Sequence, residues 1–278
     1  SLPLSGVKVI DLSMFFAGPV CAQILADAGA DVIKVESVQR MDGWRTSGAP
    51  ENSNAPSWES SPHFNWVNRN KRGITLNLKD PRGVDILKKL IRDADIVIEN
   101  YTPSVMNKFG LGFDVLRNIK PDLLMLSMPG FGADVSWRDY VAFGMPTEQM
   151  SGVAHLTGYE NESPLFTGTT GGDIYAGVVG THILLAALQE RRLTSKGQHI
   201  NLSQMEACNL FVGDAMTGWS MAGVDPERVG NRHSLFAPQG IYPCQDNRWI
   251  GISCKTDEDW HELANLIDPQ LAGKFPDV

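Results

Sequence analysis

The sequence predicts an α/β protein with a doubly wound, Rossmann-like large domain and the start of a small α+β domain. Short apolar runs of strand type alternate with helical periodicity through the first 130 residues. Hydrophobic residues make up 42% and charged residues 20% of the 278 residues, which is a globular composition that can bury a sizeable core. Strands that alternate with helices favour a parallel sheet covered on both faces.

The first strand–helix–strand unit opens the chain. Val7–Leu12 is a short apolar run, and Ala17-Gly18-Pro19 then begins a helix, because proline suits the first turn. Gly29 ends that helix and Ala30–Glu36 is the next strand. Such a unit predicts a right-handed crossover between parallel strands.

Regular structure is interrupted over residues 37–70, a polar stretch that we expect to be a long loop. Asp80-Pro81 then predicts a helix start, with Asp80 as N-cap. The elements expected after this loop are strands at Ile74–Leu78, Ala94–Glu99 and Leu123–Met128, and helices at Pro81–Arg92 and Phe113–Ile119.

The pattern after Gly130 is helical and glycine-punctuated. It predicts helices at Asp173–Arg192, Asn201–Met221 and Thr256–Leu266, and a β-hairpin after Ala237 with its turn at Asp246-Asn247. We therefore expect a large domain over residues 1–221. Residues 222–278 read as a linker and the beginning of a small domain that the sequence does not complete.

The net charge and the cysteine spacing limit which binding partners and which cellular compartment we expect. A formal net charge of −8 disfavours nucleic-acid binding through bulk positive charge. No apolar run reaches the roughly eighteen residues of a membrane helix, and the first residues lack the pattern of a signal peptide. The four cysteines show no C-x-x-C spacing. We expect a cytoplasmic protein that binds neither membrane nor nucleic acid.

Several familiar catalytic motifs are absent from the sequence. The loop after the first strand lacks G-x-G-x-x-G, which disfavours a simple NAD enzyme. No Walker A motif, H-E-x-x-H or G-x-S-x-G occurs, and His155, His182 and His199 lack metal-ligand spacing. No metal is expected.

One carboxylate stands out at the start of the Asp173–Arg192 helix. Asp173 follows Gly171-Gly172 and precedes an apolar helix, so its pattern is typical of a helix N-cap. The two glycines also leave a backbone surface that a substrate can approach closely. An aspartate at such a turn could equally act as a nucleophile towards an activated acyl group, and the local pattern leaves both interpretations open.

Basic and aromatic residues supply the remaining candidates. The cluster Asn68–Arg72 lies at a loop-to-strand boundary and taken alone is typical of a solvated surface. Arg45 or Arg138 could pair with a substrate carboxylate. Glu148 and Gln149 are candidate polar groups beside Asp173.

Long stretches of the chain resemble the class III (CaiB/BaiF, formyl-CoA transferase-like) coenzyme A transferases. The stretches run in the family's order over nearly the whole chain. They are LSGVKVIDLSMFFAGPVCAQILADAGADVIKVE, NRNKRGITLNLKDPRG, ADIVIENYTPSVMNKFGLGFDVL, LSMPGFG, MSGVAHLTG, GGDIYAGVVGTHILLAAL, GQHINLSQMEA and APQGIYPCQDNRWIGIS.

The resemblance implies a role for Asp173, which matches the family's catalytic aspartate. It implies that the carboxylate attacks a donor thioester, giving an aspartyl anhydride and CoA thiolate. The thiolate then forms an aspartyl-CoA thioester, and an acceptor carboxylate reverses the exchange. Coenzyme A would enter and leave as a thioester, and the substrates would be an acyl-CoA and a small carboxylic acid. The N-cap and nucleophile interpretations are compatible.

The resemblance also implies contacts with coenzyme A. Arg40 could replace an arginine that the family often has where this chain has Ser37. The other residues that match cofactor contacts of the family are Phe15, Phe16, Lys79, Asn100, Tyr101, Lys108 and, with different spacing, Arg138.

Two other functions stay open. The superfamily includes acyl-CoA racemases, whose catalytic histidine would fall at Phe143, so this function loses ground. Family members normally continue past the small domain and interlock as dimers. The chain is therefore expected to form an interlocked homodimer or a complex with a related subunit, or else to be a non-catalytic CoA-binding subunit or a fragment.

Overall fold

The computed structural model describes residues 1–48, 50, 54–168 and 170–275. The chain divides into two compact units. Unit 1 comprises residues 1–153 and 166–214, and unit 2 comprises residues 154–165 and 215–278, of which the last three lie outside the described residues. These units follow from spatial proximity, so the sequence-based division at residue 221 stays a prediction.

Unit 1 is built on a six-stranded parallel sheet of order β3-β2-β1-β4-β5-β6, which confirms the predicted fold class. The strands are β1 (Lys8–Asp11), β2 (Asp31–Glu36), β3 (Lys71–Thr75), β4 (Ile96–Glu99), β5 (Leu124–Ser127) and β6 (Gln198–Asn201). The central strands β4 and β5 are buried at every position, because a parallel sheet is covered by helices on both faces.

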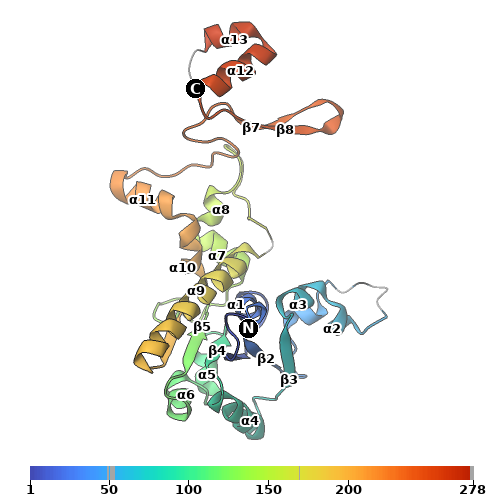
Figure 1. The fold of residues 1–278 in the computed structure, drawn as a ribbon, viewed down its shortest axis with the longest axis vertical. Coiled ribbons are helices and arrows are strands. Elements are labelled where there is room, and N and C mark those ends of the chain that lie inside the picture. The colour runs from blue at the N-terminus through green and yellow to red at the C-terminus, as the bar shows by residue number, and fades with distance from the viewer. Residues whose placement is uncertain (49, 51–53, 169, 276–278) are drawn as a thin grey trace. The chain divides into compact units, whose positions relative to one another are not determined.

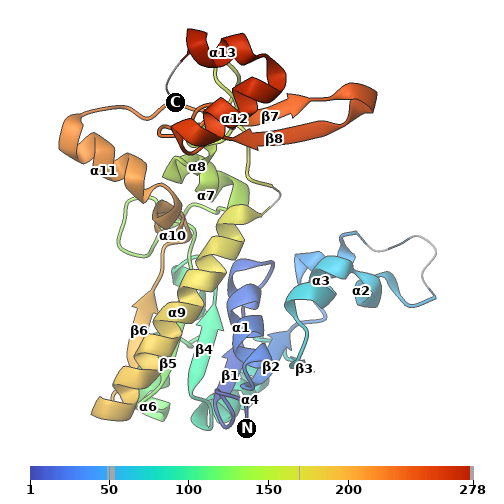
Figure 2. The ribbon, with the colours of Figure 1, turned by 45° about the horizontal axis from the view of Figure 1, so that its top comes forward.

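Helices cover both faces of this sheet (Figures 1 and 2). Val9 of β1 packs in the cluster that includes Leu25 and Leu184 of the helices on one face, and Ile10 packs in the cluster that includes Leu87 on the other. The helices of unit 1 are α1 (Ala17–Asp27), α2 (Ser57–Ser60), α3 (Pro62–Val67), α4 (Pro81–Arg92), α5 (Ser104–Lys108), α6 (Phe113–Ile119), α7 (Gly144–Ser151), α9 (Gly171–Thr194) and α10 (Gln204–Cys208), with 3₁₀ turns η1 (Gly43–Thr46) and η2 (Asn209–Phe211).

Helix α9 packs closely against α1. A Cβ at Gly177 would lie 2.8 Å from the carbonyl oxygen of Ala17, so this contact requires glycine. Among the described residues, α9 is the one helix whose length and apolar composition would allow it to cross a membrane. Core helices pass the same test, and its buried residues belong to the core with β5 and α1.

Three sequence expectations are corrected by unit 1. The stretch 37–70 contains η1, α2 and α3, and β3 begins at Lys71 instead of Ile74. The predicted helix Asn201–Met221 is divided into α10, η2 and α11 (Gly213–Ala222), because its first residue belongs to β6, which pairs with β5. The Ser203 side chain then accepts a hydrogen bond from the Glu206 N–H and starts a new helix.

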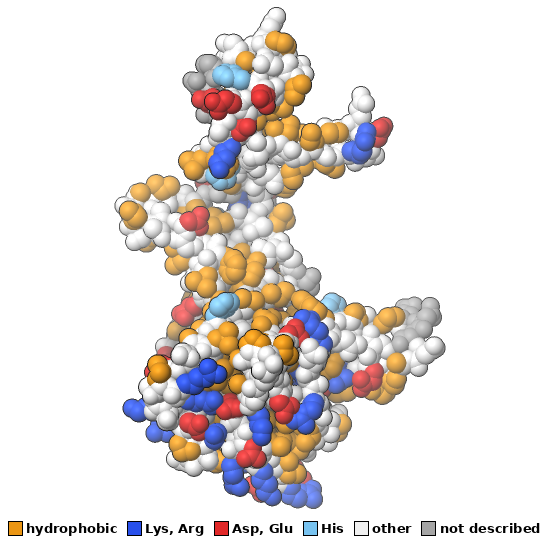
Figure 3. Space-filling model, in the orientation of Figure 1, with side chains coloured by type: hydrophobic (Ala, Val, Ile, Leu, Met, Phe, Trp, Pro, Cys, Tyr) orange, Lys and Arg blue, Asp and Glu red, His pale blue; other side chains and the backbone are white. Residues whose placement is uncertain are grey.

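Unit 2 contains the expected hairpin and helix. Strand β7 (Gln239–Pro243) pairs antiparallel with β8 (Trp249–Ser253). The turn has left-handed Asp246 and Asn247, which is a conformation that these two residue types tolerate. The other elements are α8 (Val153–Leu156), which starts in unit 1, most of α11, η3 (Gln245–Asn247), α12 (Asp257–Ile267) and α13 (Pro269–Lys274). Figure 3 shows hydrophobic side chains along the hairpin and charged ones at its tip.

Candidate active site

A cavity of about 530 Å³ lies in unit 1 where the parallel strands end. Residues that follow β3, β2, β1, β4, β5 and β6 all line it, among them Lys79, Phe15, Asn100 and Gln204. Neighbouring strands lie about 4.8 Å apart, so the lining extends over about 24 Å from β3 to β6. A doubly wound sheet binds ligands at this edge, at the switch point between β1 and β4, and a cavity of this length fits an extended molecule.

Asp173 lies in this cavity, in the first turn of α9. The residue at the N-cap position is Thr170, so the structure corrects the N-cap interpretation of Asp173. Its Oδ2 accepts a hydrogen bond of 3.0 Å from the N–H of Gly144, the first residue of α7. The N–H of Ala17, the first residue of α1, lies on the same side and lowers the pKa of the carboxylate. The positive ends of two further helices therefore meet at one side chain.

Gly144 is required for this arrangement. A Cβ at this position would lie 2.7 Å from Oδ2 of Asp173 and 3.2 Å from its backbone nitrogen. Any other residue would push the carboxylate away from the α7 N-terminus. The sequence signal for this role is only a glycine after Phe143, which nothing local distinguishes from other glycines.

Burial raises the pKa of Asp173 to about 6, against the opposing effect of the Gly144 and Ala17 N–H groups. The negative charge of Glu148 raises it further. Asp173 is 5% exposed and forms no ion pair with any described residue. The carboxylate is thus ionised at neutral pH and stabilised by N–H dipoles alone, which suits a nucleophile.

Glu148 organises the turn before Asp173, close to where the sequence analysis expected it. Its Oε1 accepts a 3.0 Å hydrogen bond from the N–H of Gly172. Its Oε2 accepts from the N–H and the hydroxyl of Thr167 at 3.0 and 2.9 Å. Gln149, the second candidate, is exposed. Glu148 therefore holds the glycine turn and does not itself line the cavity.

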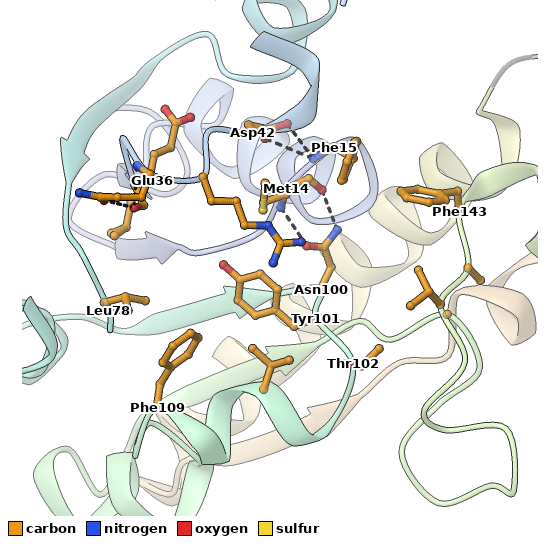
Figure 4. A pocket seen from close by; sticks show the side chains of 18 of the residues that line it. Met14, Phe15, Glu36, Asp42, Leu78, Asn100, Tyr101, Thr102, Phe109 and Phe143 are labelled. Carbon is orange, nitrogen blue, oxygen red and sulfur yellow. Dashed lines mark hydrogen bonds between the residues drawn. The ribbon is translucent and has the colours of Figure 1, made fainter. Parts of the chain in front are cut away.

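Side chains hold three consecutive residues between β1 and α1, which are Ser13, Met14 and Phe15, and Figure 4 shows the hydrogen bonds to the last two. Asp11 accepts from Ser13, and Lys34 donates to the Ser13 carbonyl. Asn100 accepts from the Met14 N–H at 2.8 Å and donates to its carbonyl at 2.7 Å. Both carboxylate oxygens of Asp42 lie 3.2 Å from the N–H of Phe15, which has a left-handed φ of 64°.

A buried charge network anchors this segment. Lys71 Nζ lies 2.9 Å from Asp11 Oδ2, and Lys34 Nζ lies 3.4 Å from Asp42 Oδ2 and 3.9 Å from Asp11 Oδ2. Burial opposes ionisation of Asp11, but the two lysines hold its pKa below the usual value. Burial lowers the pKa of Lys71 to about 8. The ammonium group of Lys71 is thus buried, although the sequence around it is typical of a solvated surface.

Five of the predicted coenzyme A contacts line the cavity. Arg40 and Lys79 are exposed cations that form no ion pair with any described residue, so both are available to an anion. Phe15 and Tyr101 present aromatic rings, and the Tyr101 hydroxyl donates to the Leu12 carbonyl. Asn100 lines the cavity as well, but its amide is used on Met14.

The structure places the other predicted contacts outside this cavity. Phe16 is buried against Trp44 and Trp66, with ring centroids 4.5 and 5.5 Å away. Lys108 is an exposed residue at the end of α5. Arg138 lines a second cavity of about 190 Å³ with Glu99, Ser127 and His199. Cofactor roles for these residues stay predictions.

Arg45 is committed elsewhere. It donates two hydrogen bonds, of 2.8 and 2.7 Å, to the Glu36 carboxylate, and its guanidinium carbon lies 3.7 Å from the centre of the Phe64 ring. Such a bidentate, stacked arginine has few donors left for a substrate carboxylate. The sequence pattern could not show this pairing.

Two further features bear on the chemistry. The Gln204 amide N–H₂ donates to the Met128 carbonyl at 2.7 Å, while its buried Oε1 has no hydrogen-bond partner among the described residues.

Phe143 lies at the position where a racemase would carry its histidine, and its ring centroid lies 5.1 Å from that of Phe15. Among the described residues, no histidine lines the main cavity. Over the described chain, no group of three or more His, Cys, Asp or Glu side chains is placed to hold a metal ion.

Comparison with known proteins gives a consistent result. The family model "CoA-transferase family III" matches residues 4–277. The beta subunit of succinyl-CoA–L-malate CoA-transferase from Chloroflexus aurantiacus is 36% identical over 276 residues, which cover 98% of this chain and 67% of that protein. Acetyl-CoA:oxalate CoA-transferase from Acetobacter aceti is 35% identical over 97% of this chain and 68% of its own length.

Solved structures agree with the sequence matches. A CaiB/BaiF family protein from Brucella suis superimposes with a TM-score of 0.88 at 31% identity, over 98% of this chain and 71% of that one. The chain spans about two thirds of the length of the curated relatives that it matches.

Proposed function

The chain belongs to CoA-transferase family III, and we propose that it transfers coenzyme A from an acyl-CoA to a carboxylic acid, with Asp173 as the nucleophile. The observation that carries this proposal is the Asp173 carboxylate, which lies at the cavity wall with the N-termini of α1 and α7 directed at it. A buried carboxylate without a cation is costly to maintain, so its position favours a chemical role over a structural one.

The proposed reaction proceeds in balanced steps. A carboxylate oxygen of Asp173 attacks the thioester carbonyl, the C–S bond breaks, and CoA leaves as a thiolate, giving an acyl–aspartyl anhydride. The thiolate attacks the aspartyl carbonyl and releases the donor acid, giving an aspartyl-CoA thioester. The acceptor carboxylate attacks that thioester to form a second anhydride and the thiolate again. Attack of the thiolate on the acceptor carbonyl forms the new acyl-CoA and frees the Asp173 carboxylate.

The helix N-termini suit this sequence. Negative charge passes from the carboxylate to a tetrahedral oxygen and then to sulfur, all close to the N–H groups of Ala17 and Gly144. Fixed N–H dipoles stabilise charge that develops beside them without reorganisation. Each intermediate keeps the acyl group activated, so the steps are close in energy.

Coenzyme A would extend along the cavity. Arg40 and Lys79, which pair with no acidic side chain among the described residues, supply positive charge for its phosphates, although the chain carries a net charge of −8. The pantetheine arm would pass Tyr101 and Phe109 and bring the thioester to Asp173. The lining of about 24 Å is long enough for such an extended ligand.

The substrate class and the assembly are also proposals. The relatives are named for succinyl-CoA or acetyl-CoA donors and for malate or oxalate acceptors, so we expect short carboxylic acids here. Relatives named as alpha and beta subunits support a complex with a related subunit, and an interlocked homodimer is the alternative that we keep. We place the reaction in the cytoplasm.

Trapping with hydroxylamine tests the nucleophile. The protein is incubated with a panel of acyl-CoAs, hydroxylamine is added, and modified carboxylates are mapped by peptide mass. A hydroxamate at Asp173 that is absent from Asp173→Asn is the expected result, and the productive thioester identifies the donor. Asp173→Asn should still bind free CoA. Binding of CoA without any modification would overturn the covalent route, and exchange of the α-proton with D₂O would then favour the racemase alternative.

A further inference from the structure

The second buried aspartate at the cavity is Asp42, which is 2% exposed. Its two oxygens accept from the N–H of Phe15 at 3.2 Å each, and Oδ1 also accepts from the N–H of Trp44 at 3.1 Å. Oδ2 pairs with Lys34 at 3.4 Å. With both oxygens engaged by the protein, Asp42 has little capacity left for a substrate.

The partner of Asp42 is a residue in an unfavourable conformation. Phe15 has a φ of 64°, which lies in the left-handed region that favours glycine and is unfavourable for other residues. Such a conformation persists only where surrounding contacts enforce it. Asp42 supplies the hydrogen bonds to its N–H, and the Phe15 ring packs so closely on Gly43 that a Cβ there would lie 2.3 Å from a ring carbon.

Phe15 leads directly to the groups that surround Asp173. Phe16 is the N-cap of α1, and Ala17 is its first residue. The Ala17 N–H lowers the pKa of Asp173, and a Cβ at Gly177, one turn after Asp173, would lie 2.8 Å from the Ala17 carbonyl oxygen, so Ala17 packs beside the start of α9. The backbone conformation at Phe15 therefore sets the direction in which this N–H points. The chain of contacts runs from Asp42 through the Phe15 backbone to Ala17 and then to Asp173.

We propose that Asp42 is a positioning residue for the nucleophile, which holds the Phe15 backbone so that the Ala17 N–H is aimed at the Asp173 carboxylate. The predicted effect of Asp42 on the reaction rate rests on the proposed function, whereas its effect on the geometry does not. Lys34 pairs with Asp42 and holds it in place, and its hydrogen bond to the Ser13 carbonyl joins the same segment to β2. Asp42 thus acts on the reaction without touching a reacting atom.

Backbone amide NMR tests the geometry without requiring turnover. In the unaltered protein, the ¹⁵N shifts of Ala17 and Gly144 should both follow the titration of Asp173. In Asp42→Ala the Gly144 shift should still follow it, whereas the Ala17 shift should lose most of its amplitude. Glu148 is the other charged group beside Asp173, and its contacts are unchanged in this variant. Equal titration amplitudes at both amides in Asp42→Ala would overturn the proposal.

Kinetics supply the second readout. At saturating acyl-CoA, Asp42→Ala should slow hydroxylamine trapping at Asp173 by about a hundredfold, the cost of a catalytic group misplaced by about 1 Å. In this variant, the acid limb of the pH profile of the trapping rate should move to higher pH, because the Asp173 carboxylate loses an N–H donor. Asp80→Ala is a matched control, since Asp80 also accepts a backbone N–H, that of Arg82, but lies outside the cavity. A slower rate with an unmoved acid limb contradicts the proposal.

A second variant, Gly43→Ala, tests the proposal if Asp42→Ala folds poorly. Gly43→Ala leaves every charge in place and displaces the Phe15 ring. It should weaken the Ala17 titration and slow trapping in the same direction. If Gly43→Ala titrates and reacts like the unaltered protein, the coupling from Phe15 to Asp173 is absent. If the unaltered protein shows no trapping with any donor, the proposed function fails, while the amide titration still decides the role of Asp42.

Discussion

Two buried carboxylates in unit 1 are stabilised in opposite ways. Asp11, at the end of β1, lies within 4 Å of two lysines, with Lys71 at 2.9 Å and Lys34 at 3.9 Å. Asp173, at the start of α9, has no cation among the described residues and accepts only backbone N–H groups. The pKa of Asp11 is lowered and that of Asp173 is raised to about 6, although both are buried.

This difference distinguishes a carboxylate that anchors the chain, Asp11, from one that is free to react, Asp173. An ion pair neutralises a carboxylate and fixes the chain around it, so Asp11 and its lysines hold the segment that leads to α1. N–H dipoles offset only part of the burial and leave the carboxylate's electrons available. The proposed nucleophile therefore lies where no described cation pairs with it, next to a segment that ion pairs hold in place.

The largest effect is expected from removing the Asp173 carboxylate, and it is an effect on activity. Asp173→Asn removes the nucleophile but keeps an acceptor for the Gly144 N–H, so the fold should persist. Transfer of CoA between an acyl-CoA and an acid should fall by about four orders of magnitude or more. Isotope exchange between labelled acid and acyl-CoA measures it. Activity within tenfold of the unaltered protein would assign the chemistry to another group.

The next effect falls on stability at the other carboxylate. Lys71→Met leaves Asp11 buried with one lysine at 3.9 Å, and removing one partner of a buried pair costs about 3–5 kcal/mol of unfolding free energy. Arg72→Gln, the neighbouring position on β3, breaks an exposed pair with Asp31 and should cost about 0–1 kcal/mol. Urea unfolding of both variants measures the difference. Equal losses would show that the buried network does not anchor the chain.

How far the sequence predicts this arrangement depends on the range of the interactions. The continuous apolar runs of β4 and β5 and the Asp80-Pro81 helix start are local signals, and the structure confirms them. Asp173 was found from its glycine turn and from the family resemblance. By contrast, β6 has the sequence Gln-His-Ile-Asn with alternating exposure at the sheet edge, so it carries little apolar signal.

The parts that were missed depend on contacts between distant segments. Lys71 lies in a basic run that resembles solvated surface, and only the fold brings it to Asp11, 60 positions earlier. Gly144 faces Asp173 across 29 positions, and nothing local distinguishes it from other glycines. Phe16 matches a cofactor contact of the family by position, and that role stays a prediction; the enclosure of its side chain by Trp44 and Trp66 could not be seen from the sequence. Sequence order could place the segments but not the partners of their side chains.

A smaller effect concerns the stability cost of the nucleophile. Because the pKa of Asp173 is about 6 when folded and 3.8 ordinarily, the folded state binds more protons between these values. The free energy of unfolding therefore falls as pH rises through this window, and the loss is complete above pH 6. Asp173→Asn should be more stable than the unaltered protein by about 1–3 kcal/mol at pH 7.5, and the difference should shrink towards pH 4. Urea unfolding at both pH values measures it. A less stable variant at pH 7.5 would mean that the N–H bonds outweigh burial.

The smallest effect tests which cations serve the cavity. Lys79 lines it without an ion partner among the described residues, so Lys79→Ala should raise the Kd for CoA by about tenfold, the equivalent of one charge-assisted hydrogen bond. Lys108→Ala is the matched control, because Lys108 is equally exposed but lies outside the lining. Calorimetry at two salt concentrations should show a weaker salt dependence for Lys79→Ala alone, since one phosphate contact is lost. A larger loss for Lys108→Ala would place the phosphates beyond the cavity, towards α5, and would favour the position that the family resemblance implies.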